Sequence, residues 1–210
     1  MNSLQRNEAW FESRHGKITS SRAHVVVFGG PKGWLSLIDL MRKEMQGERP
    51  PELYVDPVVR GRELESAAIA NAELILGEEF ERVGFVNHPI IPYIGCSSDA
   101  LARNHAVNVE AKAYSNRERH LGVYMSRQMP RDHMAQVQCQ MAVHNADLTL
   151  FISHFPEMPH WKMRTVIVEV PRDQSFIDRF YESCDRFIRA FRGERDLVEH
   201  VPAHRIPKLF

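Results

Sequence analysis

The residues best suited to chemistry in this 210-residue sequence are Asp99 and the triplet Glu110-Ala111-Lys112. If residues 107–113 form a β-strand, Glu110 and Lys112 point to the same face, because side chains alternate along a strand. Asp99 precedes this segment by an interval that suits two neighbouring strands joined by a turn. The pattern predicts that two carboxylates and one ammonium group meet at one point.

Hydrolysis of a phosphodiester requires this combination of groups. Carboxylate oxygens hold Mg²⁺ while several waters stay attached to the ion. The metal lowers the pKa of a bound water and offsets the charge that grows on the phosphoryl oxygens. Lys112 could orient the attacking water and stabilise the developing charge. Glu65, on a helix after Gly61, would add a further carboxylate. Alternating charges are also common on exposed strands, so the pattern alone leaves a solvated strand face as an alternative.

The elements that must position these residues follow from the spacing of apolar residues. Helical periodicity predicts helices at residues 23–28, 35–45, 64–76, 134–143 and 176–191. Strand-like runs lie at 82–87, 90–95, 107–113, 148–155 and 162–170, with a turn at 103–106. Residues 46–57, rich in proline, read as a loop. This order predicts a central mixed β-sheet flanked by helices, in the α/β or α+β class.

Composition and length narrow the class of protein. The chain suits a single domain over residues 1–210, and 43% hydrophobic with 26% charged residues is typical of a soluble globular protein. Its apolar runs are too short to cross a bilayer, and its N-terminus lacks the apolar run of a signal peptide. The three separated cysteines argue against a disulfide framework and an iron–sulfur cluster. We therefore expect a cytoplasmic protein without membrane contact.

Charge distribution permits binding to nucleic acid. The formal net charge is zero, but phosphate binding depends on local clusters more than on the total. The segment 103–131 is basic and 63–81 is acidic. The basic segment includes the candidate DNA-channel residues Arg117, Arg119 and Arg127. The many histidines show no HExxH-like spacing, which disfavours a zinc site.

Four ordered blocks give the sequence a specific resemblance. They are Trp10-x3-Arg14-x-Gly16-x-Ile18-Thr19-x-Ser21, Gly61-x3-Glu65, Cys96-Ser97-x-Asp99-x-Leu101 leading to Glu110-x-Lys112, and Met134-Ala135-Gln136-Val137-Gln138. In order and approximate spacing they resemble the lambda exonuclease family, the phage-type YqaJ recombinase nucleases. The resemblance implies a restriction-endonuclease-like α/β fold.

The resemblance also implies roles for individual residues. The metal ligands would be Asp99, Glu110, the Ala111 carbonyl and Glu65, and they would hold a pair of Mg²⁺ ions that Mn²⁺ can replace. The catalytic residues would be Glu65, Asp99, Glu110, Lys112 and Gln138. The pocket for the 5′-phosphate of a DNA end would consist of Arg14, Ser21 and Ser97, which supply donors suited to phosphate.

Four residues in or beside these blocks carry expectations of their own. Gln136 and Gln138 cannot share one helical face, because residues two apart diverge; we place Gln138 in the site and expect Gln136 to pack or cap. Ser98 stands where the family usually has a proline before the aspartate, which affects the geometry of that turn. Arg60 replaces an aromatic residue and could contact DNA or remain solvated.

The function implied by the resemblance is a Mg²⁺-dependent alkaline exonuclease acting on double-stranded DNA ends. It would digest the 5′-ended strand, release 5′-mononucleotides and leave 3′ single-stranded overhangs for recombination. A ring-shaped homotrimer and a single-strand annealing protein as partner are also implied. Two alternatives are another nuclease, of the restriction or RecB-like helper type, and a DNA-end-binding module whose nuclease fold is inactive.

Overall fold

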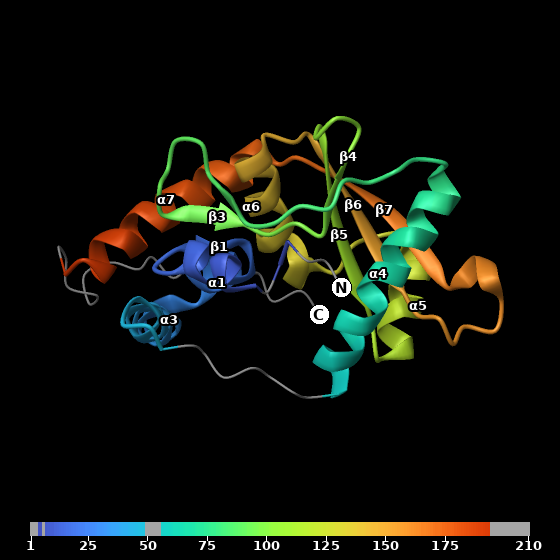
Figure 1. Ribbon diagram of the computed structural model, residues 1–210, viewed down its shortest axis with the longest axis horizontal. Helices are drawn as coiled ribbons and strands as arrows, with labels where there is room; N and C mark the ends of the chain where they lie inside the picture. Colours follow the sequence, from blue (N-terminus) through green and yellow to red (C-terminus); the bar gives the residue numbers. More distant parts are fainter. Residues whose placement is uncertain (1–3, 6, 49–55, 194–210) are drawn as a thin grey trace.

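Two β-sheets organise the computed structural model, which describes residues 4–5, 7–48 and 56–193 (Figure 1). The larger sheet has the order β4-β5-β6-β7. Its strands are β4 (Ala100–Ala102), β5 (Val107–Ala113), β6 (Leu148–His154) and β7 (Thr165–Pro171). β5 runs parallel to β6, whereas the β4–β5 and β6–β7 pairs are antiparallel. The expected mixed sheet is therefore present.

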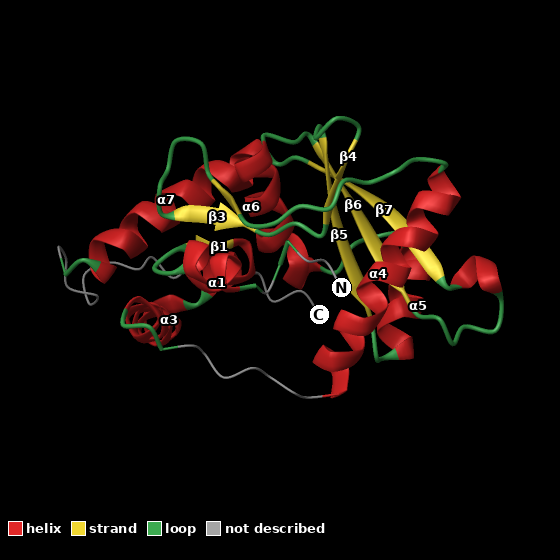
Figure 2. Ribbon diagram, in the orientation of Figure 1, coloured by secondary structure: helices red, strands yellow, loops and turns green. Residues whose placement is uncertain are grey.

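A second, smaller sheet lies apart from the first (Figure 2). It has the order β1-β3-β2, with strands β1 (Ile18–Thr19), β3 (Ile94–Cys96) and β2 (Val86–Asn87). β1 and β3 are parallel, with Thr19 opposite Gly95. Because parallel strands end at the same edge of a sheet, Ser20 and Cys96 leave it side by side.

Helices cover both faces of the larger sheet. On one face, α4 (Asp56–Leu76) packs Ala68 and Ile69 against Val109 and Ile152. On the other, a separate apolar cluster joins residues of α5 (Arg117–Ser126), α6 (Met134–His144) and the sheet. Its fully buried members include Val137, Met141 and Phe151. Burial of these side chains on both faces stabilises the sheet that carries Glu110.

The smaller sheet has its own helical layer, at the left of Figure 1. The helices are α1 (Glu8–Arg14), α2 (Ala23–Phe28), α3 (Gly30–Met45) and α7 (Gln174–Phe191). Trp34, Phe180 and Phe187 pack together with Ile18 and Ile94 in one core. Cys139 of α6 belongs to this core as well. Helix α6 is thus shared by the two halves of the molecule.

The described residues also form three 3-10 helices: η1 (Ser20–Arg22), η2 (Arg131–His133) and η3 (Trp161–Met163). η1 links β1 directly to α2, and η2 leads into α6.

The sequence predicted most of the long elements. The helices expected at 64–76, 134–143 and 176–191 correspond to α4, α6 and α7, and the strand at 107–113 is β5. Among the described α-helices and strands, four were not predicted: α1, α5 and the short strands β1 and β4. The helix expected at 23–28 is α2, which ends at Phe28 as predicted. The helix expected at 35–45 is α3, which begins earlier, at Gly30, whose φ of 59° turns the chain, with Pro31 in the first turn.

The proline-rich loop expected at 46–57 falls partly on residues 49–55, which lie outside the described residues. Among the helices that are described, none has the length and apolar character needed to span a bilayer.

Candidate active site

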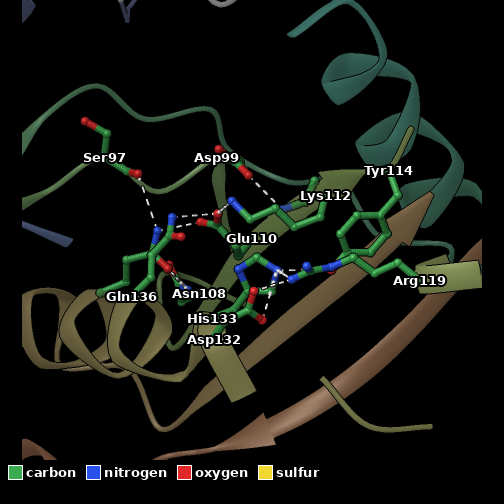
Figure 3. A network of polar contacts seen from close by, with 12 residues as sticks. Ser97, Asp99, Asn108, Glu110, Lys112, Tyr114, Arg119, Asp132, His133 and Gln136 are labelled. Atoms are coloured by element: carbon green, nitrogen blue, oxygen red, sulfur yellow. Dashed lines mark hydrogen bonds and ion pairs between the residues drawn. The ribbon is translucent and has the colours of Figure 1, made fainter. Parts of the chain in front are cut away.

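Strand β5 presents its polar side chains on one face, as the alternation predicted. Glu110 is only 1% exposed, and both of its carboxylate oxygens accept hydrogen bonds (Figure 3). Lys112 Nζ forms an ion pair with Oε1, and Gln136 Nε2 donates to the same oxygen over 2.7 Å. Gln140 Nε2 donates to Oε2 over 2.6 Å. The buried charge of Glu110 is therefore compensated from both sides.

Asp99 lies beside Glu110 because of the register between β4 and β5. Ala100 pairs with Val109, and the Asp99 N–H donates to the Val109 carbonyl over 3.2 Å. The Asp99 carboxylate then accepts the Ala111 N–H over 2.7 Å. Thus the aspartate is held by the strand that carries Glu110, as the sequence predicted.

The carboxylates repel one another in this arrangement. Burial first, and then the charges of Glu110 and Glu65, raise the pKa of Asp99 well above its ordinary value. Glu65 on α4 is half-buried and close enough to contribute to this effect. The structure therefore places Glu65 and Glu110 close enough to Asp99 for their charges to raise its pKa.

Lys112 remains charged in the site. Burial opposes the ammonium form, but the carboxylates of Glu110 and Asp99 outweigh it and hold the pKa of Lys112 above its ordinary value. A lysine in this state is a fixed positive charge and a hydrogen-bond donor. It suits stabilisation of an anion better than removal of a proton.

A row of buried polar side chains fixes the direction of the Gln140 amide that donates to Glu110. Asn108 Nδ2 donates to Gln140 Oε1 over 3.1 Å and to Thr149 Oγ1 over 3.0 Å. Because the Gln140 oxygen is engaged by Asn108, its amide nitrogen points at Glu110. This row extends from β6 through β5 to α6.

The expectation for the two glutamines of α6 needs correction. Gln136, which we expected to pack or cap, contacts Glu110. Gln138, which we placed in the site, donates to the Pro171 carbonyl and accepts the Asp173 N–H, each over 2.9 Å. The two glutamine side chains do point in different directions, as predicted. The rotation of α6 about its axis, however, turns Gln136 toward the site. Gln138 instead joins α6 to the start of α7.

The three residues expected to grip a 5′-phosphate lie at the end of α1 and just after strands β1 and β3 of the smaller sheet. Trp10 Nε1 donates to Ser97 Oγ over 2.9 Å, and the Arg14 guanidinium lies 4.1 Å from the Trp10 ring centroid. Ser21 Oγ is hydrogen-bonded to Thr19 Oγ1 over 3.0 Å. Thr19 and Gly95 are paired strand residues, so Ser21 and Ser97 follow adjacent strand ends. Arg14 is thus linked to Ser97 through Trp10.

The oxygen ligands at this site fit Mg²⁺, although few side chains supply them. Among the described residues, no group of three or more His, Cys, Asp or Glu side chains could hold a metal ion by itself. Mg²⁺ needs less than that, since it is commonly bound through one or two carboxylates and keeps its waters. Asp99 and Glu110 supply two carboxylates, and their repulsion is what a cation would relieve. The main chain of Ala111 adjoins Asp99.

A polar group next to Lys112 was not predicted from the sequence. His133 Nε2 lies 3.0 Å from Tyr114 Oη and 3.3 Å from the Arg119 guanidinium, which is paired with Asp132 (Figure 3). Burial first, and then the charge of Lys112, lower the pKa of His133 to about 4. Tyr114 follows β5 directly, so the alternation Glu110, Lys112, Tyr114 could have indicated it.

Arg60 has a partner that the sequence did not suggest. It forms an ion pair with Glu157 in the turn between β6 and β7, and its guanidinium lies 5.8 Å from the Phe155 ring centroid. Neither of the two expectations, DNA contact or simple solvation, included this pairing. It ties the start of α4 to the β6–β7 turn.

Cys96, Cys139 and Cys184 are buried free thiols.

Comparisons with known proteins agree with this geometry. The model of the YqaJ-like viral recombinase domain matches residues 9–147. The comparison with curated proteins gave no match. Among solved structures, the alkaline exonuclease LHK-Exo from Laribacter hongkongensis matches with a TM-score of 0.81 and 25% identity, over 90% of this chain and 94% of that one. Its complex with dAMP gives a TM-score of 0.82, also at 25% identity and the same coverage.

A phage-related exonuclease from Haemophilus somnus 129PT matches with a TM-score of 0.68 and 15% identity, over 88% of this chain and 97% of that one. At this identity the likeness concerns the fold alone. The family match covers the strands and helices that bring Glu65, Asp99, Glu110 and Lys112 together, and the fold is the restriction-endonuclease-like one of alkaline exonucleases. The chain therefore belongs to the YqaJ-like viral recombinase domain family.

Proposed function

We propose that this chain, a nuclease of the YqaJ-like family, is a Mg²⁺-dependent exonuclease that digests the 5′-ended strand of linear double-stranded DNA. The observation that carries the proposal is the convergence of Asp99, Glu110 and Lys112 at strand β5 of the larger sheet. The likeness to alkaline exonucleases over nearly the whole chain supports the same reaction class. That one such relative forms a complex with dAMP supports 5′-mononucleotides as the product.

Each residue has a chemical task in this reaction. Asp99, Glu110, the Ala111 carbonyl and Glu65 would bind Mg²⁺, and Mn²⁺ would substitute for it. A pair of such ions would lower the pKa of a bound water and offset negative charge on the phosphoryl oxygens. Lys112 orients the water and stabilises the charge that develops on the scissile phosphate. Gln136 and Gln140 hold Glu110 in one orientation throughout.

The end of the DNA is recognised by the smaller sheet in this proposal. Arg14 offers a planar set of donors that matches the oxygens of a terminal phosphate, and the hydroxyls of Ser21 and Ser97 add further donors. Because Ser97 lies two residues before Asp99, the phosphate pocket and the hydrolytic site are joined by a short stretch of main chain. A bound 5′-phosphate would therefore set the scissile bond at a fixed distance from the carboxylates.

The decisive experiment compares linear with covalently closed circular duplex DNA in the presence of Mg²⁺. We expect acid-soluble mononucleotides from the linear substrate and none from the circle. With label at one 5′ terminus, that label should be released before internal label. Cleavage of the circle would indicate an endonuclease, and tight binding of ends without hydrolysis in Mg²⁺ or Mn²⁺ would indicate an inactive end-binding module.

Two further properties belong to the same proposal. We infer a ring-shaped homotrimer around duplex DNA and a single-strand annealing protein that receives the 3′ overhangs, both acting in the cytoplasm. The support is the family membership alone. Sedimentation equilibrium would test the trimer: a mass of one subunit at micromolar concentration would contradict it.

A further inference from the structure

One face of α6 carries a polar stripe directed at the carboxylates. Gln136, Gln140 and His144 are spaced by four residues, so they lie above one another on the same side of the helix. Gln136 and Gln140 each donate to one oxygen of Glu110. His144 ends the stripe and contacts the segment that leads to Asp99. A single rigid helix therefore touches the supports of both carboxylates.

The segment 96–99 connects the two sheets, and hydrogen bonds hold its middle residues, Ser97 and Ser98, in place. Gln140 Nε2 also donates to the Ser97 carbonyl over 3.4 Å, and Gln5 Nε2 donates to the Ser98 carbonyl over 2.9 Å. Ser98 has no exposed surface, and its hydroxyl lies 3.1 Å from His144 Nε2. Asp99 is the next residue, so the orientation of Ser98 determines the position of the Asp99 main chain.

The protonation states in this cluster agree with a specific hydrogen bond. Burial lowers the pKa of His144 to about 4, so the ring is neutral at neutral pH. A neutral imidazole has one acceptor nitrogen. Nε2 faces the Ser98 hydroxyl and also the Cys96 thiol, 3.2 Å away. Burial raises the pKa of Cys96 to about 12, so both neighbours carry a proton that Nε2 can accept.

We propose that His144 is a positioning residue that fixes the Asp99 carboxylate beside Glu110 by holding Ser98. The inference rests on the proposed metal site, since what His144 positions is one of its ligands. Partners of this kind, which orient a metal ligand without touching the metal, typically contribute 10-fold to 100-fold in metal affinity or activity. Helix α6 then sets the separation of the two carboxylates, through glutamines on one side and His144 on the other.

The residue at position 98 gives the inference a further basis. The resemblance described above leads one to expect a proline before the aspartate, which would stiffen the turn through its ring. This chain has Ser98 instead, and the Ser98–His144 hydrogen bond supplies the restraint from outside. Rigidity of the turn is retained by a different physical means.

A double-mutant cycle on the full chain tests the inference. We would measure Mn²⁺ affinity by calorimetry and the Mg²⁺ concentration that half-saturates nuclease activity, for His144→Leu, Ser98→Ala and the double variant. Each single substitution should weaken Mn²⁺ binding and raise the Mg²⁺ requirement by about 10-fold. The double variant should be no worse than either single one, because both remove the same restraint.

A matched control separates positioning from general destabilisation. Thr165 Oγ1 lies 2.9 Å from His154 Nδ1, so Thr165→Val removes a comparable buried hydroxyl–histidine bond between β6 and β7, away from the carboxylates. It should lower the thermal midpoint by a similar amount and leave Mn²⁺ affinity unchanged. If His144→Leu and Thr165→Val behave alike in both measurements, His144 has only a structural role and the inference is wrong.

Two more variants make the outcome specific. If Asp99→Ala bound Mn²⁺ as tightly as the native chain does, this would contradict both the proposed function and the positioning role of His144. Loss of Mn²⁺ binding in Asp99→Ala, with unchanged binding in His144→Leu, would contradict the positioning role alone. Ser98→Pro combined with His144→Leu should recover the native Mg²⁺ requirement. A folded double variant without that recovery would show that stiffness of the turn is not what His144 provides.

Discussion

The two halves of the candidate site are held in different ways. On the larger sheet, Glu110 is buried and bonded on both carboxylate oxygens, and the row of amides behind it is buried as well. Beside the smaller sheet, Ser21 is exposed and Arg14 is half-buried against the face of Trp10. In the proposed function the first of these is the catalytic half, and its fixed geometry would avoid a reorganisation cost when substrate binds. The second is the end-binding half, which is more open to solvent.

The largest effect should come from breaking the catalytic half. Asp99→Ala removes a proposed metal ligand, and Lys112→Ala removes the fixed positive charge. Each should reduce nucleotide release by about 100-fold to 1000-fold or more, whether the end carries a phosphate or a hydroxyl. Lys162→Ala, in the exposed 3-10 helix η3, is the matched lysine control and should retain native activity. Substantial activity in Asp99→Ala would refute the assigned site.

The catalytic half also permits a test of its buried supports. Gln140→Leu leaves one oxygen of Glu110 without its donor, so activity per folded molecule should fall by about 10-fold to 100-fold. Gln138→Leu is the comparison within the same helix: it should reduce stability by roughly 1–3 kcal/mol, through the lost bonds to the start of α7, with activity retained. Equal losses of activity in both variants would remove the distinction between the two glutamines.

The end-binding half should respond to the chemistry of the DNA end. Arg14→Ala should slow digestion of 5′-phosphorylated ends by about 10-fold or more, because a charge-assisted hydrogen bond to phosphate is lost. Digestion of 5′-hydroxyl ends should change much less. Initial rates on two otherwise identical duplexes measure this directly. The same slowing on both would mean that Arg14 does not read the phosphate.

The smallest effect concerns the pH dependence of stability at His133, beside the catalytic half. The pKa of this residue is about 4 in the folded chain, against about 6.5 when unfolded. The unfolded state therefore binds the proton first, and stability falls as the pH drops below about 6.5 and continues to fall to about 4. At pH 5, His133→Gln should recover roughly 1–2 kcal/mol of this loss.

Urea unfolding of the native chain and of His133→Gln, at pH 7.5 and pH 5, measures the difference. His24→Gln, at an exposed position on α2, serves as the control and should leave the pH dependence of the native chain intact. Identical acid sensitivity of the native chain and His133→Gln would contradict the explanation.

Sequence alone predicted the parts of the site that depend on local period. Alternation along residues 107–113 placed Glu110 and Lys112 on one face, and β5 has those bounds. Strand β4 was missed because it has only three residues, two of them alanine, and forms through pairing with β5. Its existence depends on a partner segment more than on its own composition.

Contacts between distant elements could not be predicted in the same way. The helical period shows that Gln136 and Gln138 point in different directions. Only the rotation of α6 relative to β5 decides which of them reaches Glu110. The bond between Ser98 and His144 joins residues that are 46 positions apart. Helix α5 has a weakly apolar sequence, and it forms where Asn116 accepts the Arg119 N–H and caps its first turn.

The central claim is that a divalent cation binds between the two carboxylates. Anomalous diffraction from crystals soaked in Mn²⁺ tests it directly. The account predicts a peak within about 2.0–2.3 Å of oxygens from both Asp99 and Glu110, the range for hard cations such as Mg²⁺. A peak elsewhere, or none at saturating Mn²⁺, would contradict it.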